Sequence, residues 1–209
     1  MAFLLTTASE ARQALGLNTD KHDAYLERLI PGVSAMIARF LNRVGDDLLA
    51  DGLERRARVE TLDVEPLQRQ YRVSAGPLVT LTDVRYDPLR TFGTESIINS
   101  ENVTIRSRPM GELWIDFALV AQKRDRGVQT LQVSYTGGMF ADLDEMRVQA
   151  PELELACQQQ MHAILQSQKI GPMRTSVSGQ GGSVNRQELT LLAIVKDLIR
   201  HLRRPAVGN

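Results

Sequence analysis

The hydrophobic residues of this chain change their spacing along the sequence, and this change constrains the fold more than any other feature. Near the start they recur every three or four residues, which is the period of a helix that buries one face. In the middle they alternate with polar residues, as in a half-buried strand. In the last third the helical period returns. We therefore expect an α+β fold, with a helical core of N-terminal helices plus two C-terminal helices, and a central β lobe.

Residues 1–54 are predicted to form the N-terminal helices. Thr7 and Glu10 have the spacing of a capping box, which predicts a short helix over about residues 8–15. A longer helix should follow from Asp20. Its apolar face consists of Leu26, Leu29, Ile30, Val33, Ile37, Phe40, Leu41 and Val44. Pro31 lies inside this pattern and has no backbone N–H to donate, so we expect a kink or a break there.

Residues 55–140 are predicted to form the central β lobe. Strand patterns occupy about residues 58–64, 70–73, 78–86, 103–106, 113–119 and 131–136, and the clearest is Leu131, Val133 and Tyr135 alternating with polar residues. Turn sequences lie at Gly76-Pro77 and Gly137-Gly138. No helix of useful length separates these segments, so parallel crossovers have no room and an antiparallel sheet is the simplest arrangement.

The last third of the chain is predicted to contain two helices. Pro151 suits the first position of a helix over residues 151–170. Residues 171–186 are rich in glycine and serine, and they are predicted to be a flexible segment. Asn185 and Glu188 form a second capping-box pattern. The amphipathic helix and basic tail of residues 187–209 follow, with an apolar stripe of Leu191, Leu192, Val195, Leu198, Ile199 and Leu202.

Composition excludes several classes of protein. Lys plus Arg and Asp plus Glu number 25 each, so the formal charge is zero, which argues against a whole-surface affinity for nucleic acid or an anionic membrane. The single cysteine, Cys157, rules out an internal disulfide framework, and its place on an apolar helix face predicts a core role. No apolar run approaches the roughly 20 residues of a membrane span. We expect a protein made in the cytoplasm.

No pattern of catalytic or metal-binding residues emerges. His22, His162 and His201 lie far apart and outside any nucleophile motif. Residues 178–183 lack the preceding strand and the lysine of a phosphate loop, so a linker is the preferred interpretation. The acidic residues Asp142, Asp144 and Glu145 lack the spacing of a calcium loop and are interpreted as a solvated loop. We predict no enzymatic activity, no metal and no cofactor.

The C-terminal segment carries an excess of positive charge that admits two interpretations. From Arg186 to the end, the basic residues are Arg186, Lys196, Arg200, Arg203 and Arg204, against Glu188 and Asp197. These cations are favoured at the C-terminus of a helix by its dipole. They could equally meet an acidic partner surface or DNA phosphates. The charge pattern leaves both interpretations open.

The order of segments resembles that of the head–tail connector (adaptor, or head-completion) proteins of tailed bacteriophages. Four stretches carry this likeness: residues 3–11, residues 23–43, residues 76–87, and residues 131–139 followed by Pro151-Glu152-Leu153. They are similar to the family's opening strand-to-helix segment, its long helix, its first sheet strand, and its closing strand with a proline-started helix. The interruption at Pro31-Gly32, the enlarged β lobe and the glycine-rich segment depart from the family pattern.

The resemblance implies a structural virion protein, with residues 1–209 as a single connector domain. Such proteins form a homo-oligomeric ring of about 12 subunits in the virion neck, made in the bacterial host cytoplasm. The ring lies between the portal protein and a tail or stopper protein, and double-stranded DNA passes through its channel without sequence-specific binding. No membrane is involved.

The same resemblance assigns candidate residues to these contacts. The basic residues Arg186, Lys196, Arg200, Arg203 and Arg204 become candidates for docking on the portal, with their segment ordering on docking. The candidates for the subunit core or the ring interface are Leu26, Leu29, Ile30, Ile37, Leu192, Val195 and Ile199. The alternative function is a DNA-binding packaging or regulatory protein that uses the basic C-terminal helix.

Overall fold

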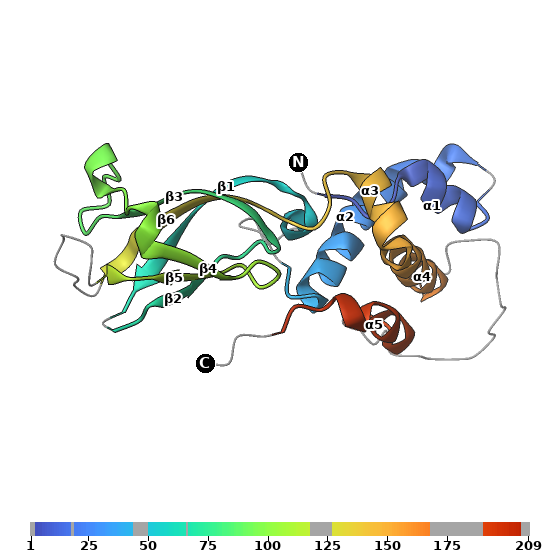
Figure 1. The fold of residues 1–209 in the computed structure, drawn as a ribbon. Helices are drawn as coiled ribbons and strands as arrows, with labels where there is room; N and C mark the ends of the chain where they lie inside the picture. The colour runs from blue at the N-terminus through green and yellow to red at the C-terminus, as the bar shows by residue number, and fades with distance from the viewer. Residues whose placement is uncertain are drawn as a thin grey trace, which may run out of the picture. The chain divides into compact units, whose positions relative to one another are not determined.

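The computed structural model describes residues 3–17, 19–43, 50–65, 67–117, 127–167 and 190–205. The chain divides into two compact units (Figure 1). The helical unit comprises Met1–Asn42, Leu48–Ala50 and Asp142–Asn209, and the β unit comprises Arg43–Asp47 and Asp51–Ala141. Both ends of the chain therefore contribute to one unit, and the middle forms the other. The predicted α+β class is confirmed.

The helical unit is built around two long helices. Its α-helices are α1 (Ala8–Ala14), α2 (Asp23–Phe40), α3 (Leu143–Gln149), α4 (Pro151–Ser167) and α5 (Ala193–Ile199). Helix α2 packs against α1 and α4, and α4 packs against α3 and α5. The apolar stripes of α2 and α4 meet in this core, which is why segments far apart in sequence share one unit.

The predicted capping box of α1 is confirmed. The backbone N–H of Glu10 donates to the Thr7 hydroxyl at 3.3 Å, and the backbone N–H of Thr7 donates to the Glu10 carboxylate at 3.2 Å. Both bonds satisfy donors that a helix N-terminus would otherwise leave unpaired. Beyond the helix, Gly16 has a positive φ of 66°, which suits a residue without a side chain.

Helix α2 continues through Pro31 from Asp23 to Phe40, so the predicted break is wrong. Leu26, Ile30, Val33 and Ile37 are each at most 1% exposed and lie on both sides of the proline. Burying each such side chain contributes about 1.5–3 kcal/mol. Together they outweigh the roughly 3 kcal/mol that an interior proline costs, so the helix continues past Pro31.

The acidic stretch before Pro151 forms helix α3, which corrects its interpretation as a solvated loop. Asp142 is the N-cap, and its carboxylate accepts a hydrogen bond from the backbone N–H of Glu145 at 2.8 Å. Asp144 and Glu145 occupy the first turn, where negative charge interacts favourably with the helix dipole. The acidic residues that were interpreted as part of a loop therefore mark the start of a helix.

The β unit contains two antiparallel sheets among the described residues, where one was expected. Its strands are β1 (Arg56–Val64), β2 (Gln70–Arg72), β3 (Leu78–Tyr86), β4 (Val103–Ser107), β5 (Glu112–Ile115) and β6 (Gly127–Gly137). The strand orders are β1-β6-β3 and β2-β5-β4. Inward-facing residues of both sheets, among them Val133, Tyr135, Tyr71 and Leu113, form one buried core. Short strands that share a core can thus divide into two layers.

Strand β3 departs from the simple alternation of its sequence. Its pairing with β6 shifts register between Leu78 and Thr80 and again between Leu81 and Asp83. Each shift changes which side chains face the core. As a result Val84 and Tyr86 are buried, whereas the apolar side chain of Val79 is 39% exposed.

Asp87 organises the loop that follows β3. Its carboxylate accepts hydrogen bonds from the backbone N–H groups of Leu89, Thr91 and Phe92, each at 2.8 Å, and from the Thr91 hydroxyl at 2.5 Å. The Thr91 hydroxyl bond, together with the three backbone bonds, lowers the pKa of Asp87 to about 2. Arg90 and Phe92 both have positive φ angles in this loop. The carboxylate therefore holds a conformation that these residues rarely adopt by themselves.

The low pKa of Asp87 predicts a stability that depends on pH. In the unfolded chain an aspartate has a pKa of about 3.9, so the stabilisation by Asp87 should be complete above about pH 5 and lost as the pH falls toward 2. The Asp87→Asn variant should therefore be less stable than the wild type at neutral pH, and this difference should shrink near pH 2.5. Urea unfolding at both pH values measures it. An equal difference at the two values would contradict the assignment.

Candidate interaction surfaces

The C-terminal segment is part of the helical core. Val195 and Ile199 of α5 are 0% exposed, and α5 packs against α4. The sequence predicted that this segment orders on docking. In the structure residues 190–205 are already packed within one chain, because the apolar face of α5 finds its partner there. The proposed capping box at Asn185 and the glycine-rich segment lie outside the described residues.

The residues after α5 are attached to the end of α2. The backbone N–H of Arg204 donates to the carbonyl of Leu41 at 3.0 Å, and the side-chain amide of Asn42 donates to the Arg204 carbonyl at 2.7 Å. The Arg203 guanidinium lies 5.2 Å from the centre of the Phe40 ring. This is a cation–π contact, which adds to the attachment.

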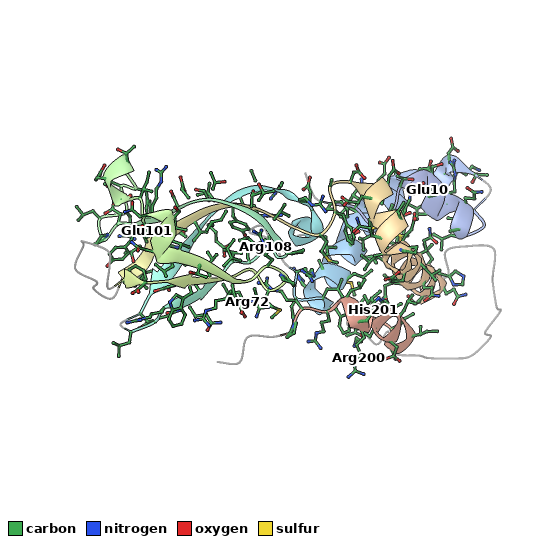
Figure 2. The ribbon with its side chains drawn as sticks, in the orientation of Figure 1. Glu10, Arg72, Glu101, Arg108, Arg200 and His201 are labelled. Carbon is green, nitrogen blue, oxygen red and sulfur yellow. The ribbon has the colours of Figure 1, made fainter. Side chains whose placement is uncertain are left out.

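These contacts divide the candidate docking residues into separate groups. Arg200 and Arg203 are exposed, Lys196 is half-buried, and Arg204 is only 5% exposed. Arg186 lies outside the described residues. Figure 2 shows Arg200 next to His201, whose Nε2 lies 3.0 Å from the Glu152 carboxylate. The described cations therefore differ in exposure, and Arg204 is buried within the helical unit.

The candidates for core or ring interface are mostly core residues of the helical unit. Leu26, Ile30, Ile37, Val195 and Ile199 are each at most 1% exposed. Leu29 is partly buried, and Leu192 is 37% exposed. Among these residues, only the last two retain surface for another chain.

A charged cluster joins α1, α3 and α4. The Arg147 guanidinium contacts Glu154 at 2.9 Å and 3.0 Å and also contacts Glu10. The hydrogen bonds to Glu154, and then those to Glu10, raise the pKa of Arg147, so it stays charged. Thr6 donates a further hydrogen bond to Glu154 at 2.9 Å. The cluster lines a shallow depression together with Gln13 and Gln158. The Arg147 guanidinium and the carboxylates of Glu10 and Glu154 pair with one another, so we interpret the cluster as structural.

The outer face of the sheet β2-β5-β4 holds a cluster of arginines around the chain's single tryptophan. On β5, Leu113 and Ile115 are buried, so the alternation places Trp114 on the opposite face. The guanidinium of Arg106 lies 4.4 Å from the centre of the Trp114 ring, and that of Arg69 lies 5.9 Å from it. Arg106 and Arg69 are exposed, and Trp114 is half-buried. We call these three residues the Arg–Trp face.

Two further arginines lie toward the β4–β5 turn. Arg72 of β2 is opposite Glu112 of β5 and donates to the Met110 carbonyl at 3.1 Å. Arg108 donates to the Val79 carbonyl at 2.5 Å. Figure 2 shows Arg72 and Arg108 toward one end of the β unit and Glu101 toward the other. Unlike the Arg–Trp face, these two guanidiniums are committed to acceptors within the unit.

The Arg–Trp face could not be found from the sequence. Arg69, Arg106 and Trp114 are spread over 69–114, and they meet only because β4 and β2 both pair with β5. The available signal was the alternation around Trp114, which places a large aromatic ring on the face away from the core. This alternation does not reveal which other strands lie beside it.

The described residues include neither an activated thiol nor a group of metal-binding side chains. Cys157 is fully buried, and this burial raises the pKa of its thiol to about 12, so it does not become a thiolate at neutral pH. Within the same residues, no group of three or more His, Cys, Asp or Glu side chains could hold a metal ion. The described helices are all too short or too polar to cross a membrane.

Comparison with known proteins finds similarity at the level of structure alone. No family model matches the chain, and no curated protein sequence matches it. A chain of the neck of an empty gene transfer agent (GTA) particle, computed with C6 symmetry, matches with a TM-score of 0.54 at 20% identity, over 98% of this chain and 93% of that one.

Two further solved structures give similar matches. A chain of the neck of the native GTA particle, computed with C12 symmetry, has a TM-score of 0.51 at 17% identity, over 100% of this chain and 98% of that one. A chain of the native GTA virion has a TM-score of 0.51 at 18% identity, over 98% and 93%.

These likenesses establish the fold of the protein. The matches extend over nearly the whole of both chains, so they include both the helical unit and the β unit. The chain is an α+β protein with the fold of chains found in the neck of GTA particles. This is the kind of structure that the resemblance to head–tail connectors predicted.

Proposed function

We propose that this chain is a member of the head–tail connector family and forms a homo-oligomeric ring in the neck of a virion. The observation that carries this proposal is the fold shared along nearly its full length with neck chains of symmetric GTA particles. An independent likeness in the order of sequence segments supports it. A ring requires an interface between two different surfaces of each subunit, arranged so that the rotation closes.

The proposal extends to the neighbours of the ring. One face meets the portal protein, the other receives a tail or stopper protein, and double-stranded DNA passes through the channel without sequence-specific binding. The described candidates for portal docking are the exposed Arg200 and Arg203 and the half-buried Lys196. A net charge of zero suits a channel that does not retain DNA. The role is structural and involves no catalysis.

The mass of the purified protein in solution tests this function, measured alone and after mixing with portal-bearing, DNA-filled capsids. We expect a closed ring of identical subunits, formed either in solution or on the capsid. A ring formed without capsids would mean that the contacts between copies of this chain are enough to close it. A ring formed only on capsids would mean that the portal acts as the template. A stable monomer or dimer that ignores capsids would contradict the proposal. Salt-sensitive retention of DNA by that monomer would instead favour the DNA-binding alternative.

A further inference from the structure

The Arg–Trp face contains hydrogen-bond donors that the described part of the chain does not use. Arg56 and Arg85 form ion pairs with Glu54 and Asp83, and Arg72 donates to a carbonyl. Within the described residues, Arg69 and Arg106 contact the ring of Trp114 and have no hydrogen-bond acceptor.

A guanidinium carries five N–H donors and is weakly hydrated, so an exposed arginine without an acceptor is suited to a partner's oxygen atoms. Glu112 is not the acceptor for Arg69 or Arg106, because it lies opposite Arg72. Asp116, beyond the end of β5, has an interaction of its own.

The composition and geometry of this face favour a protein partner. Tryptophan and arginine are the residues most enriched where interfaces are energetically important. Stacking on Trp114 restricts both guanidiniums before binding, which reduces the entropy lost on association. The two guanidiniums lie over the ring, where a nucleic-acid base would have to stack. The ligand should therefore present carboxylates beside an apolar group.

Helix α3 of the same chain presents such a combination. The side chain of Asp144 is 92% exposed, and Val148, one turn later, is 85% exposed. Residues four apart lie side by side on a helix. Glu145, next to Asp144, is half-buried, and its carboxylate already accepts a hydrogen bond from the Gln149 side chain at 2.9 Å. The ion pair of Asp144 with Arg147 is 3.5 Å long and highly exposed, so it offers little competition. We call Asp144 and Val148 the α3 face.

We propose that the Arg–Trp face of one copy binds the α3 face of a second copy. The carboxylate of Asp144 accepts hydrogen bonds from Arg69 and Arg106, and Val148 packs against the edge of the Trp114 ring. The two faces belong to different units of the chain. A contact between two different surfaces is heterologous, and it propagates from copy to copy until the rotation closes a ring. The inference rests on the proposed ring function and names the contact that builds it.

Charge reversal tests the contact. The double variant Arg69→Glu with Arg106→Glu should weaken self-association by more than about tenfold relative to the wild type. Sedimentation measures this in solution, or on portal-bearing capsids if the wild type assembles only there. Arg90→Glu is the matched control, because Arg90 is an exposed arginine of the same unit without an acceptor among the described residues. It should assemble like the wild type. Circular dichroism verifies that each variant is folded.

A charge exchange provides the decisive result. Asp144→Arg alone should also weaken assembly, and its combination with Arg106→Glu should restore a large part of it, since the two charges attract again. Assembly of the reversed variants at wild-type strength would overturn the inference and leave the ring function intact. If Asp144→Arg weakens assembly and its combination with Arg106→Glu does not restore it, the inference is also overturned. A wild-type protein that never assembles would contradict the ring function itself. Binding of a DNA duplex that is lost on reversal while the ring persists would assign the face to nucleic acid.

Discussion

The Gly138→Ala variant is expected to destabilise the β unit by about 3 kcal/mol or more. Gly138 has a φ of +124°, which residues with a side chain rarely adopt. A Cβ atom there would lie 2.0 Å from the carbonyl oxygen of Glu54 and 2.6 Å from the backbone nitrogen of Arg55. Both are backbone atoms, and Arg55 is held by a 2.7 Å hydrogen bond to the Phe140 carbonyl. Relief of the clash would therefore break the pairing at the end of β6.

Urea unfolding followed by tryptophan fluorescence measures this effect, because the single tryptophan lies in the β unit. Gly32→Ala is the control. Gly32 lies within α2, and a Cβ atom there would meet nothing within 4 Å. Alanine is favoured over glycine in a helix interior by about 1 kcal/mol, so this variant should be slightly more stable. A Gly138→Ala protein that unfolds at the wild-type urea concentration would contradict the close approach of the two backbones.

The Ile199→Ala variant is expected to destabilise the helical unit by about 2–5 kcal/mol. Ile199 is 0% exposed in the packing of α5 against α4, so truncation leaves a cavity as well as removing buried surface. The matched control on the same helix is Ile194→Ala, since Ile194 is 64% exposed. Its effect should stay within about 0.5 kcal/mol.

Far-UV circular dichroism during urea unfolding compares the two isoleucine variants, because it follows the helices. Equal stabilities would show that α5 does not contribute to the core.

The packing of α5 also changes how portal docking should be tested. A deletion of residues 186–209 would remove Val195 and Ile199 with the basic residues, so lost attachment could reflect a damaged core. Replacing the exposed Arg200 tests docking with less damage to packing.

The sequence by itself determined the types of most elements and their order. Capping at Thr7, the alternation through Tyr135 and the helix start at Pro151 are all present in the structure. These features depend on main-chain geometry over a few residues, so they can be recognised without the rest of the fold. The α+β class followed from them, and the shared fold with neck chains agrees with the resemblance of the segments.

Only the tertiary structure decided how these elements combine. It kept α2 continuous at Pro31, because buried side chains on both sides outweigh one lost hydrogen bond. It divided the strands between two sheets and brought Arg69 and Arg106 to Trp114. It also buried Arg204, a residue that the sequence assigned to a partner. Each of these outcomes depends on which distant surfaces meet. The free energy of such contacts arises between segments, and no local pattern of residues contains it.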